Sequence, residues 1–185
     1  LAALGIAVHA TVAEAVRQAD IVVSLLENGP AVEHVLFHAG AAQAMRPGTL
    51  FIDMASIQPR EARDHAARLG EMGLAHLDAP VSGGTVGAEN GTLAIMAGGR
   101  AEDFARAQPV LAALGRATHV GPHGSGQLAK LANQFSWKLT AWQLGLLFDS
   151  PVGDGSFDLV DCDLADHPQP RANHFEEYAV GSHQH

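Results

Sequence analysis

Short apolar runs rich in β-branched residues alternate with helical patterns along most of this 185-residue sequence. Residues 21–26 (IVVSLL) form one continuous apolar run, as expected of a strand that is buried on both faces. Such strands are typical of parallel sheets that are covered by helices on both sides. Because strand and helix patterns alternate throughout, the sequence predicts an α/β fold with a doubly wound parallel sheet.

Local signals place the expected elements along the chain. Thr11 and Glu14 have the spacing of a capping box, and Pro30 and Pro59 stand where proline fits the first turn of a helix. The expected helices are 11–18, 30–37, 59–72, 101–114 and 127 onward, and the expected strands are 21–26, 49–53, 76–78, 92–96 and 117–120. Residues 1–8 are typical of a helix end followed by a short strand, so the chain is expected to begin inside a fold.

The composition changes near Gln134. Residues 1–134 carry 9 Lys and Arg and 12 Asp and Glu, whereas residues 135–185 carry 2 and 8. The second segment also holds both tryptophans, the only tyrosine and the only cysteine. We therefore expect an α/β part over 1–122, a helix over 123–148 and an irregular tail over 149–185.

Composition excludes several classes of protein. A chain that is 47% hydrophobic and 17% charged is not generically disordered, and no apolar run reaches the ~18 residues that indicate a membrane span. The N-terminus lacks the pattern of a signal peptide. The net charge of −9 argues against nucleic acid as a partner. Cys162 has no second cysteine to pair with, which fits a reducing, cytoplasmic location.

A glycine-rich segment follows the expected strand at 76–78. Residues 78–84 (DAPVSGG) place two glycines directly after a serine. Consecutive backbone N–H groups and a serine hydroxyl can bind an anion such as a carboxylate. The alternative, an ordinary glycine-rich turn, stays open on composition alone.

A second motif, residues 121–134 (GPHGSGQLAKLANQ), leads into a helix. Lys130, Asn133 and Gln134 share one helical face, where a lysine could exchange a proton with a carbonyl oxygen. A solvated surface lysine is the alternative, although lysine near a helix N-terminus is disfavoured by the macrodipole. Residues 124–129 also match G-x-G-x-x-A, but no second strand follows as a dinucleotide fingerprint requires.

The histidines and the cysteine indicate no further site. His34 and His38 stand four residues apart on an expected helix, as metal ligands can, but no third ligand is placed with them. A solvated helix face is the better interpretation, and no metal is expected. Cys162 has no basic neighbour in the sequence and is assigned no nucleophilic role.

Three segments together resemble the β-hydroxyacid dehydrogenase family. They are residues 53–59 (DMASIQP), 78–99 (DAPVSGGTVGAENGTLAIMAGG) and 121–134. The family includes 3-hydroxyisobutyrate dehydrogenase, tartronate semialdehyde (2-hydroxy-3-oxopropionate) reductase and, more distantly, 6-phosphogluconate dehydrogenase. The resemblance covers residues 1–134 and implies hydride transfer between NAD or NADP and a small 3-hydroxyacid or semialdehyde.

The resemblance also implies roles for individual residues. Lys130 would be the general acid/base. Residues that would bind the substrate carboxylate or orient the substrate are Ser82, Gly83, Gly84, Asn133 and Gln134. Residues that align with cofactor contacts are Leu26, Glu27, Ala31 and Ser56, and Glu27 stands where relatives usually have proline. The Asn133–Gln134 pair is closest to the tartronate semialdehyde reductase branch.

The sequence departs from the family pattern at both ends. The family opens with a strand, a G-x-G-x-x-G turn and a helix that hold the pyrophosphate, and this unit is absent here. The segment that chooses between NAD and NADP is absent too. From Phe135 onward the sequence no longer resembles the family's apolar helix and all-helical domain. We therefore expect a partial Rossmann-type dinucleotide-binding domain over 1–122 that lacks its first βα unit, the start of an interdomain helix over 123–148, and an aberrant C-terminus.

Three hypotheses for function follow. The first is an NAD(P)-dependent dehydrogenase that acts on a small-molecule carboxylate and, as is usual in the family, forms homo-oligomers. The second is an inactive, truncated remnant that does not bind the cofactor. The third is an acidic interaction module in which residues 135–185 are the working part.

Overall fold

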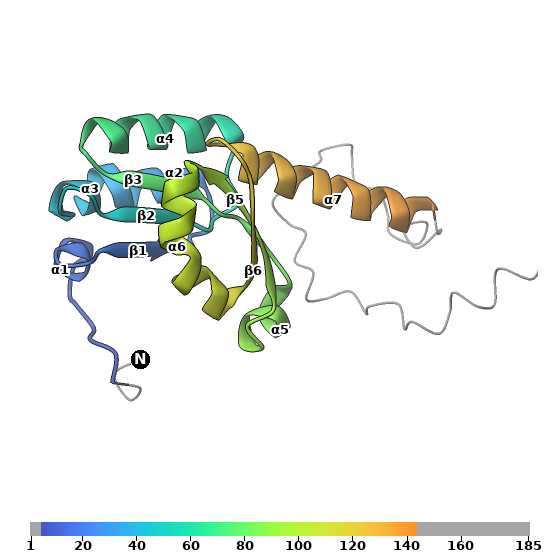
Figure 1. The fold of residues 1–185 in the computed structure, drawn as a ribbon, viewed down its shortest axis with the longest axis horizontal. Helices are drawn as coiled ribbons and strands as arrows, with labels where there is room; N and C mark the ends of the chain where they lie inside the picture. Colours follow the sequence, from blue (N-terminus) through green and yellow to red (C-terminus); the bar gives the residue numbers. More distant parts are fainter. Residues whose placement is uncertain (1–4, 144–185) are drawn as a thin grey trace, which may run out of the picture.

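A six-stranded sheet forms the centre of the molecule in the computed structural model, which describes residues 5–143 (Figure 1). Its strand order is β1-β2-β3-β5-β4, with β6 paired to β5. The strands are β1 (Ile21–Ser24), β2 (Leu50–Asp53), β3 (Ala75–Asp78), β4 (Val81–Ser82), β5 (Leu93–Gly99) and β6 (Gly115–Gly121). All five strands expected within 21–120 are therefore present, with small shifts at their ends.

Helices follow most of the strands. They are α1 (Val12–Val16), α2 (Gly29–Glu33), the π-helix η2 (His34–His38), α3 (Ala41–Ala44), α4 (Pro59–Glu71), α5 (Gly84–Glu89), α6 (Ala101–Leu114) and α7 (Ser125–Gln143). Thr11 caps α1 as its spacing predicts, because its hydroxyl accepts a hydrogen bond from Glu14 N at 3.2 Å. The elements α3, β4 and α5 were not predicted from the sequence.

The sheet is mixed rather than parallel throughout. β1, β2 and β3 run parallel to one another, and β5 and β6 run parallel to each other. β5, however, is antiparallel to both β3 and β4. The segment between β3 and β5 folds as a hairpin-like turn, in which β4 pairs back onto β5 around α5, instead of crossing over the sheet. The predicted α/β fold is confirmed, and the β3–β5 and β4–β5 pairings depart from the expected parallel sheet.

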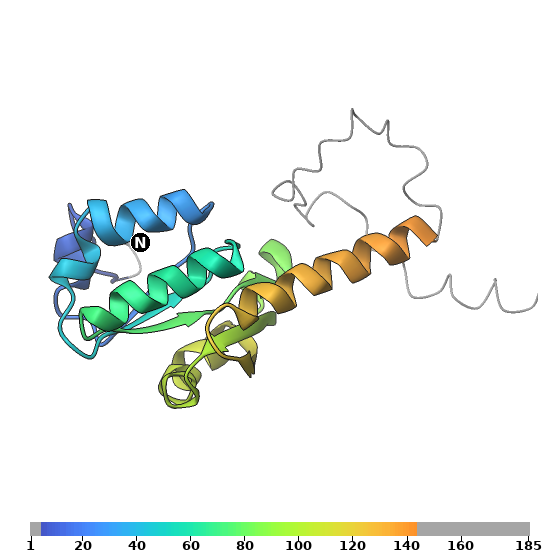
Figure 2. The same ribbon diagram turned by 90° about the horizontal axis from the view of Figure 1, so that it is seen from above.

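Two apolar clusters lie on opposite faces of the sheet. α2 and α4 cover one face and α6 covers the other (Figure 2). β2 is buried on both sides, since Phe51 packs into one cluster and Leu50 and Ile52 into the other. β1 lies at the edge of the sheet, and 43% of Val23 is exposed. The burial on both faces that was expected for 21–26 is therefore not observed.

Three further expectations concern the residues before α1, the length of α7 and the C-terminal tail. A helix end and a short strand were expected within residues 1–8; the described residues 5–8 form no strand, and Ile6 and Val8 are exposed. α7 continues past Phe135 to Gln143, so the change in composition at Gln134 does not end the helix. The tail expected over 149–185 lies outside the described residues. No helix in the described part of the chain is long and apolar enough to span a membrane.

Candidate active site at the carboxyl ends of β1, β2 and β3

Three polar residues are the last residues of the parallel strands β1, β2 and β3. Ser24, Asp53 and Asp78 are paired in register across β1, β2 and β3, each at the carboxyl end of its strand. In open α/β sheets the crevice beyond these ends is where ligands bind. The loops that follow the three strands carry the cofactor and substrate residues inferred from the family resemblance, apart from those on α7.

Asp78 joins the end of β3 to the start of α7. Its Oδ1 accepts a hydrogen bond from Gly124 N at 2.7 Å, and its Oδ2 accepts one from Gln127 N at 3.2 Å. The carboxyl is fully buried, and this burial raises its pKa, although the two amide donors and nearby His123 oppose the shift. A carboxylate at this position is favoured by the unpaired N–H groups of the helix N-terminus.

Two glycines, Gly98 and Gly126, allow the start of α7 to approach the backbones of β3 and β5 closely. A Cβ on Gly126 would lie 2.4 Å from the carbonyl oxygens of Asp78 and Met96. A Cβ on Gly98 would lie 2.7 Å from Gly126 N and from Asp78 Oδ1. The glycine at the second position of α7 therefore packs the helix start against β3 and β5.

Lys130 lies one turn further along α7. It is buried, with 8% of its surface exposed, and its Nζ donates a hydrogen bond to the carbonyl oxygen of Val81 at 2.8 Å. The alternative of a solvated surface lysine is therefore wrong. Because Val81 immediately precedes Ser82, the amino group is held beside the segment that the resemblance assigns to the substrate carboxylate.

The other residues assigned to the substrate lie in the segment after Val81 and on α7 beyond Lys130. Ser82 ends β4 and is half-buried, whereas Gly83 and Gly84 are exposed. Gly84 has φ of +58°, a conformation that favours glycine. Asn133 is exposed and Gln134 is half-buried on the next turn of α7. The structure thus brings Lys130 to the Ser82 segment, and the substrate contacts themselves stay predictions.

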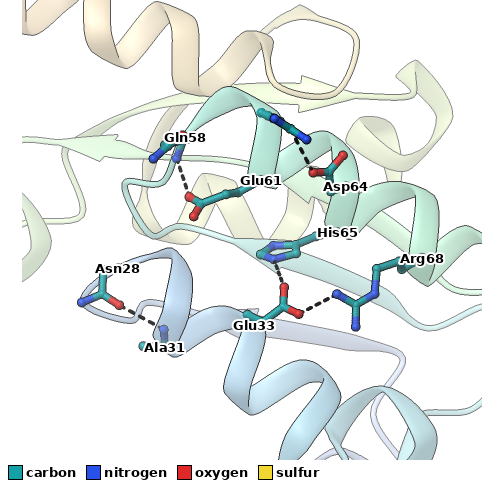
Figure 3. Close-up of polar contacts among 9 residues, drawn as sticks. Asn28, Ala31, Glu33, Gln58, Glu61, Asp64, His65 and Arg68 are labelled. Atoms are coloured by element: carbon teal, nitrogen blue, oxygen red, sulfur yellow. Dashed lines mark hydrogen bonds and ion pairs between the residues drawn. The ribbon is translucent and has the colours of Figure 1, made fainter.

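The residues assigned to the cofactor lie in the segments that follow β1 and β2. Leu26 and Glu27 follow β1, and Ala31 is in α2, where its N–H donates to the Asn28 side chain at 3.0 Å. Ser56 is exposed in the loop between β2 and α4. Figure 3 shows the start of α2, with Asn28 and Ala31, and the start of α4, with Gln58 and Glu61. The two starts are close, because a Cβ on Gly29 would clash with the Glu61 carboxylate. The two loops therefore share one edge of the sheet, as a common ligand would require.

Asp53 is a buried carboxyl at the centre of this edge. Its Oδ1 accepts a hydrogen bond from Ala55 N at 3.0 Å, whereas its Oδ2 has no hydrogen-bond partner among the described residues. Burial, reinforced by the charges of Asp78 and Glu61, raises its pKa to about 7. The hydroxyl of Ser24, its neighbour in register, is likewise buried and without a partner in the described part of the chain.

Gln127 was not singled out by the sequence analysis. Its Nε2 donates to the carbonyl oxygen of Ala55 at 2.9 Å, and its Oε1 accepts from Ile57 N at 3.1 Å. The side chain is buried. The only signal in the sequence is its position three residues before Lys130, which places both on one face of the helix.

A polar cluster fixes α2 against α4 (Figure 3). Glu33 accepts from Arg68 Nη1 at 2.6 Å, and its other oxygen lies 3.1 Å from Nε2 of His65. The hydrogen bond from Arg68 is the main reason that the pKa of Glu33 is lowered. Arg68 also stacks 3.4 Å from the ring centroid of Phe37. This cluster holds the helix that carries Ala31.

A cavity of about 440 Å³ lies at the amino end of β3, away from Lys130. Its lining includes Gly73, His76, Arg100, Arg106 and His123. His76 is buried, and desolvation lowers its pKa to about 3, so it is neutral at physiological pH. None of the residues assigned to substrate or cofactor lines this cavity.

Comparison with known proteins decides the family. Residues 1–121 match the family model described as the NAD binding domain of 6-phosphogluconate dehydrogenase. The chain belongs to the β-hydroxyacid dehydrogenase family. This confirms the resemblance, and the Rossmann-like α/β fold agrees with it.

Bacterial proteins of known function are similar to this chain in sequence. A Pseudomonas aeruginosa NAD-dependent L-serine dehydrogenase is 45% identical over 138 residues, which are 72% of this chain and 45% of that protein. The Escherichia coli 2-hydroxy-3-oxopropionate reductase is 40% identical over 157 residues, which are 83% of this chain and 54% of that protein.

A solved Mycobacterium tuberculosis 3-hydroxyisobutyrate dehydrogenase with L-serine has a TM-score of 0.71 and 38% identity, and the match covers 78% of this chain and 53% of that one. The chain thus spans about half the length of these relatives.

Proposed function

We propose that this chain forms the cofactor-side part of an NAD- or NADP-dependent dehydrogenase that acts on a small 3-hydroxyacid or the corresponding semialdehyde. The observation that carries the proposal is the buried Lys130, whose Nζ lies 2.8 Å from the carbonyl oxygen of Val81 and beside Ser82. The family supports this assignment, since its members named above are dehydrogenases and reductases of small hydroxyacids.

The carboxyl edge of β1 and β2 fits the nicotinamide half of the cofactor. Within residues 5–143, Ser24 Oγ and Asp53 Oδ2 are buried polar atoms without a hydrogen-bond partner, and both stand at the carboxyl ends of their strands, next to the crevice where ligands of such sheets bind. The residues that would hold the cofactor there are Leu26, Glu27, Ala31 and Ser56. A bound nicotinamide would supply or accept the hydride.

Lys130 would move the proton. In the direction of reduction, its Nζ would give a proton to the substrate oxygen as the carbonyl becomes a hydroxyl. In the direction of oxidation, Nζ would take the proton from that hydroxyl. The hydrogen bond to Val81 O fixes the direction of the amino group, so that the lysine is oriented before substrate arrives.

The segment after Val81 would hold the substrate carboxylate. The Ser82 hydroxyl and the backbone N–H groups of Gly83 and Gly84 are donors, and the absence of side chains on the glycines permits close approach. Asn133 and Gln134, one turn beyond Lys130, would orient the rest of the substrate. A homo-oligomeric state stays a prediction from the resemblance, and a cytoplasmic location stays a prediction from the single cysteine.

Turnover of Lys130 variants tests the proposal. Wild type, Lys130→Ala and Lys130→Arg would be assayed with NAD and with NADP, using 3-hydroxyisobutyrate and L-serine as substrates. Both variants should lose kcat by about 100-fold or more, because arginine keeps the charge but cannot release its proton. Binding of the carboxylate should persist in Lys130→Arg.

Wild-type kcat in Lys130→Ala would refute the role of Lys130. An absence of saturable NADH and NADPH binding in the wild type would instead favour the inactive remnant. The acidic interaction module would be favoured if deletion of residues 150–185 abolished binding of a partner protein.

A further inference from the structure

We infer that Gln127 is a positioning residue that sets the Ser56 loop at a fixed distance from Lys130. The predicted effect on kcat rests on the proposed function. The fixed position of the Ser56 loop rests only on hydrogen bonds within this chain. One buried side-chain amide donates to Ala55 O at 2.9 Å and accepts from Ile57 N at 3.1 Å. These two contacts flank Ser56, which is assigned to the cofactor.

We call the two hydrogen bonds from the Gln127 side chain to Ala55 and Ile57 the clamp. Their opposite polarity restricts which side chains can replace glutamine. Ala55 offers an acceptor and Ile57 offers a donor, so only a side chain with both functions at its end satisfies the two residues together. Gln127 is 3% exposed, so water does not replace these bonds readily. Loss of the amide would leave a buried N–H and a buried C=O without their partners.

The same residue is fixed to the other side of the site through its backbone. Its N–H donates to Asp78 Oδ2 at 3.2 Å, at the end of the strand that leads to Val81. Lys130 follows three residues later, about one helical turn along the same face of α7. Gln127 therefore connects the loop after β2, the end of β3 and the turn of α7 that carries the lysine.

This arrangement predicts an effect on kcat beyond any effect on stability. If the Ser56 loop moves relative to Lys130, the cofactor and the proton donor lose their alignment, and a misplacement of about 1 Å can cost ~100-fold in rate. Substrate binding at Ser82–Gly84 involves neither Ala55 nor Ile57, so KM for the hydroxyacid should change little. A merely structural role would lower stability without this split.

Gln127→Met in the full chain tests the inference, because methionine keeps the length of the side chain but lacks both polar functions. The matched control is Thr49→Val. Thr49 is also buried, and its hydroxyl donates to Ala19 O at 3.0 Å at the opposite end of the strands. The readouts are hydrogen exchange of the Ile57 amide, the unfolding midpoint, and kcat and KM with 3-hydroxyisobutyrate.

The expected result is faster exchange at Ile57 and a loss of kcat of about tenfold or more at nearly constant KM in Gln127→Met alone. Thr49→Val should lose stability but keep kcat. Unchanged exchange at Ile57, or an unchanged kcat in an active enzyme, would overturn the inference. If the wild type shows no turnover, the proposed function fails. Hydrogen exchange of the Ile57 amide then decides by itself whether Gln127 holds the Ser56 loop.

A second variant covers the case in which Gln127→Met does not fold. Gln127→Glu keeps an oxygen that can accept from Ile57 N–H but, when ionised, cannot donate to Ala55 O. The Ile57 amide should stay protected while kcat falls. Wild-type kcat in a folded Gln127→Glu would contradict the need for both contacts.

Discussion

Gly126→Ala tests the close packing on which the site depends. A Cβ at this position would lie 2.4 Å from the carbonyl oxygens of Asp78 and Met96, well inside the 3.0 Å below which Cβ atoms are essentially never found. Both oxygens belong to the backbone and cannot rotate away. The start of α7 must therefore move by more than half an ångström, which also disturbs the hydrogen bonds to Asp78.

The expected cost follows from overpacking. Extra methyl groups in a well-packed interior cost about 1–3 kcal/mol, which corresponds to a fall in Tm of about 3–10 °C for a chain of this size. Gly70→Ala is the matched control, because Gly70 lies inside α4 and its Cβ would have no atom within 4 Å. It should stabilise the protein by about 0.5–1 kcal/mol through helix propensity.

The assay is urea unfolding followed by far-ultraviolet circular dichroism, on wild type and both variants. We expect Gly126→Ala to unfold at lower urea and Gly70→Ala at higher urea than wild type. If Gly126→Ala is as stable as wild type, the reasoning about the junction between β3, β5 and α7 is wrong.

Two further predictions concern buried polar groups. Burial raises the pKa of Asp53 to about 7 in the folded state, above the ~4 of an unfolded chain, so its contribution to stability is full below pH ~4 and is lost as the pH rises to about 7. Asp53→Asn should therefore gain stability relative to wild type between pH 5 and 8 in urea titrations, and a pH-independent difference would contradict the shift. Glu33→Ala should cost about 1–3 kcal/mol, because it removes the Nε2 partner of buried His65. Asp64→Ala, which breaks an exposed pair with Arg60, should cost less than about 0.5 kcal/mol in the same thermal-unfolding assay, and equal losses would refute the difference.

The elements with strong local signals were predictable from the sequence. The helix at 101–114 begins and ends where its pattern predicts, since an apolar face and the following Gly115 mark its length. A strand was predicted at 49–53, and β2 forms there, buried on both faces because helices cover both sides of the sheet. Lys130 was assigned to the site from the family resemblance; its burial beside Val81 is observed, and its catalytic role stays a prediction.

Elements without a local signal were missed. The β4–α5 segment depends on pairing of Val81 and Ser82 with β5, a contact between residues more than ten positions apart in the sequence. Residues 80–84 (PVSGG) are too short and too rich in glycine to show a periodicity that could indicate it. The clamp formed by Gln127 depends on Ala55 and Ile57, about 70 residues away, and is equally invisible in a local pattern.

We propose that the carboxyl ends of β1, β2 and β3 hold the nicotinamide and the substrate carboxylate next to each other. The most direct measurement follows backbone amide resonances of the chain by NMR during titration with NADH and then 3-hydroxyisobutyrate. We predict that NADH shifts the amides of residues 26–31 and 55–57, and that the hydroxyacid then shifts those of residues 82–84. Shifts confined to the cavity around His76 and Arg106, or no saturable shift, would contradict the account.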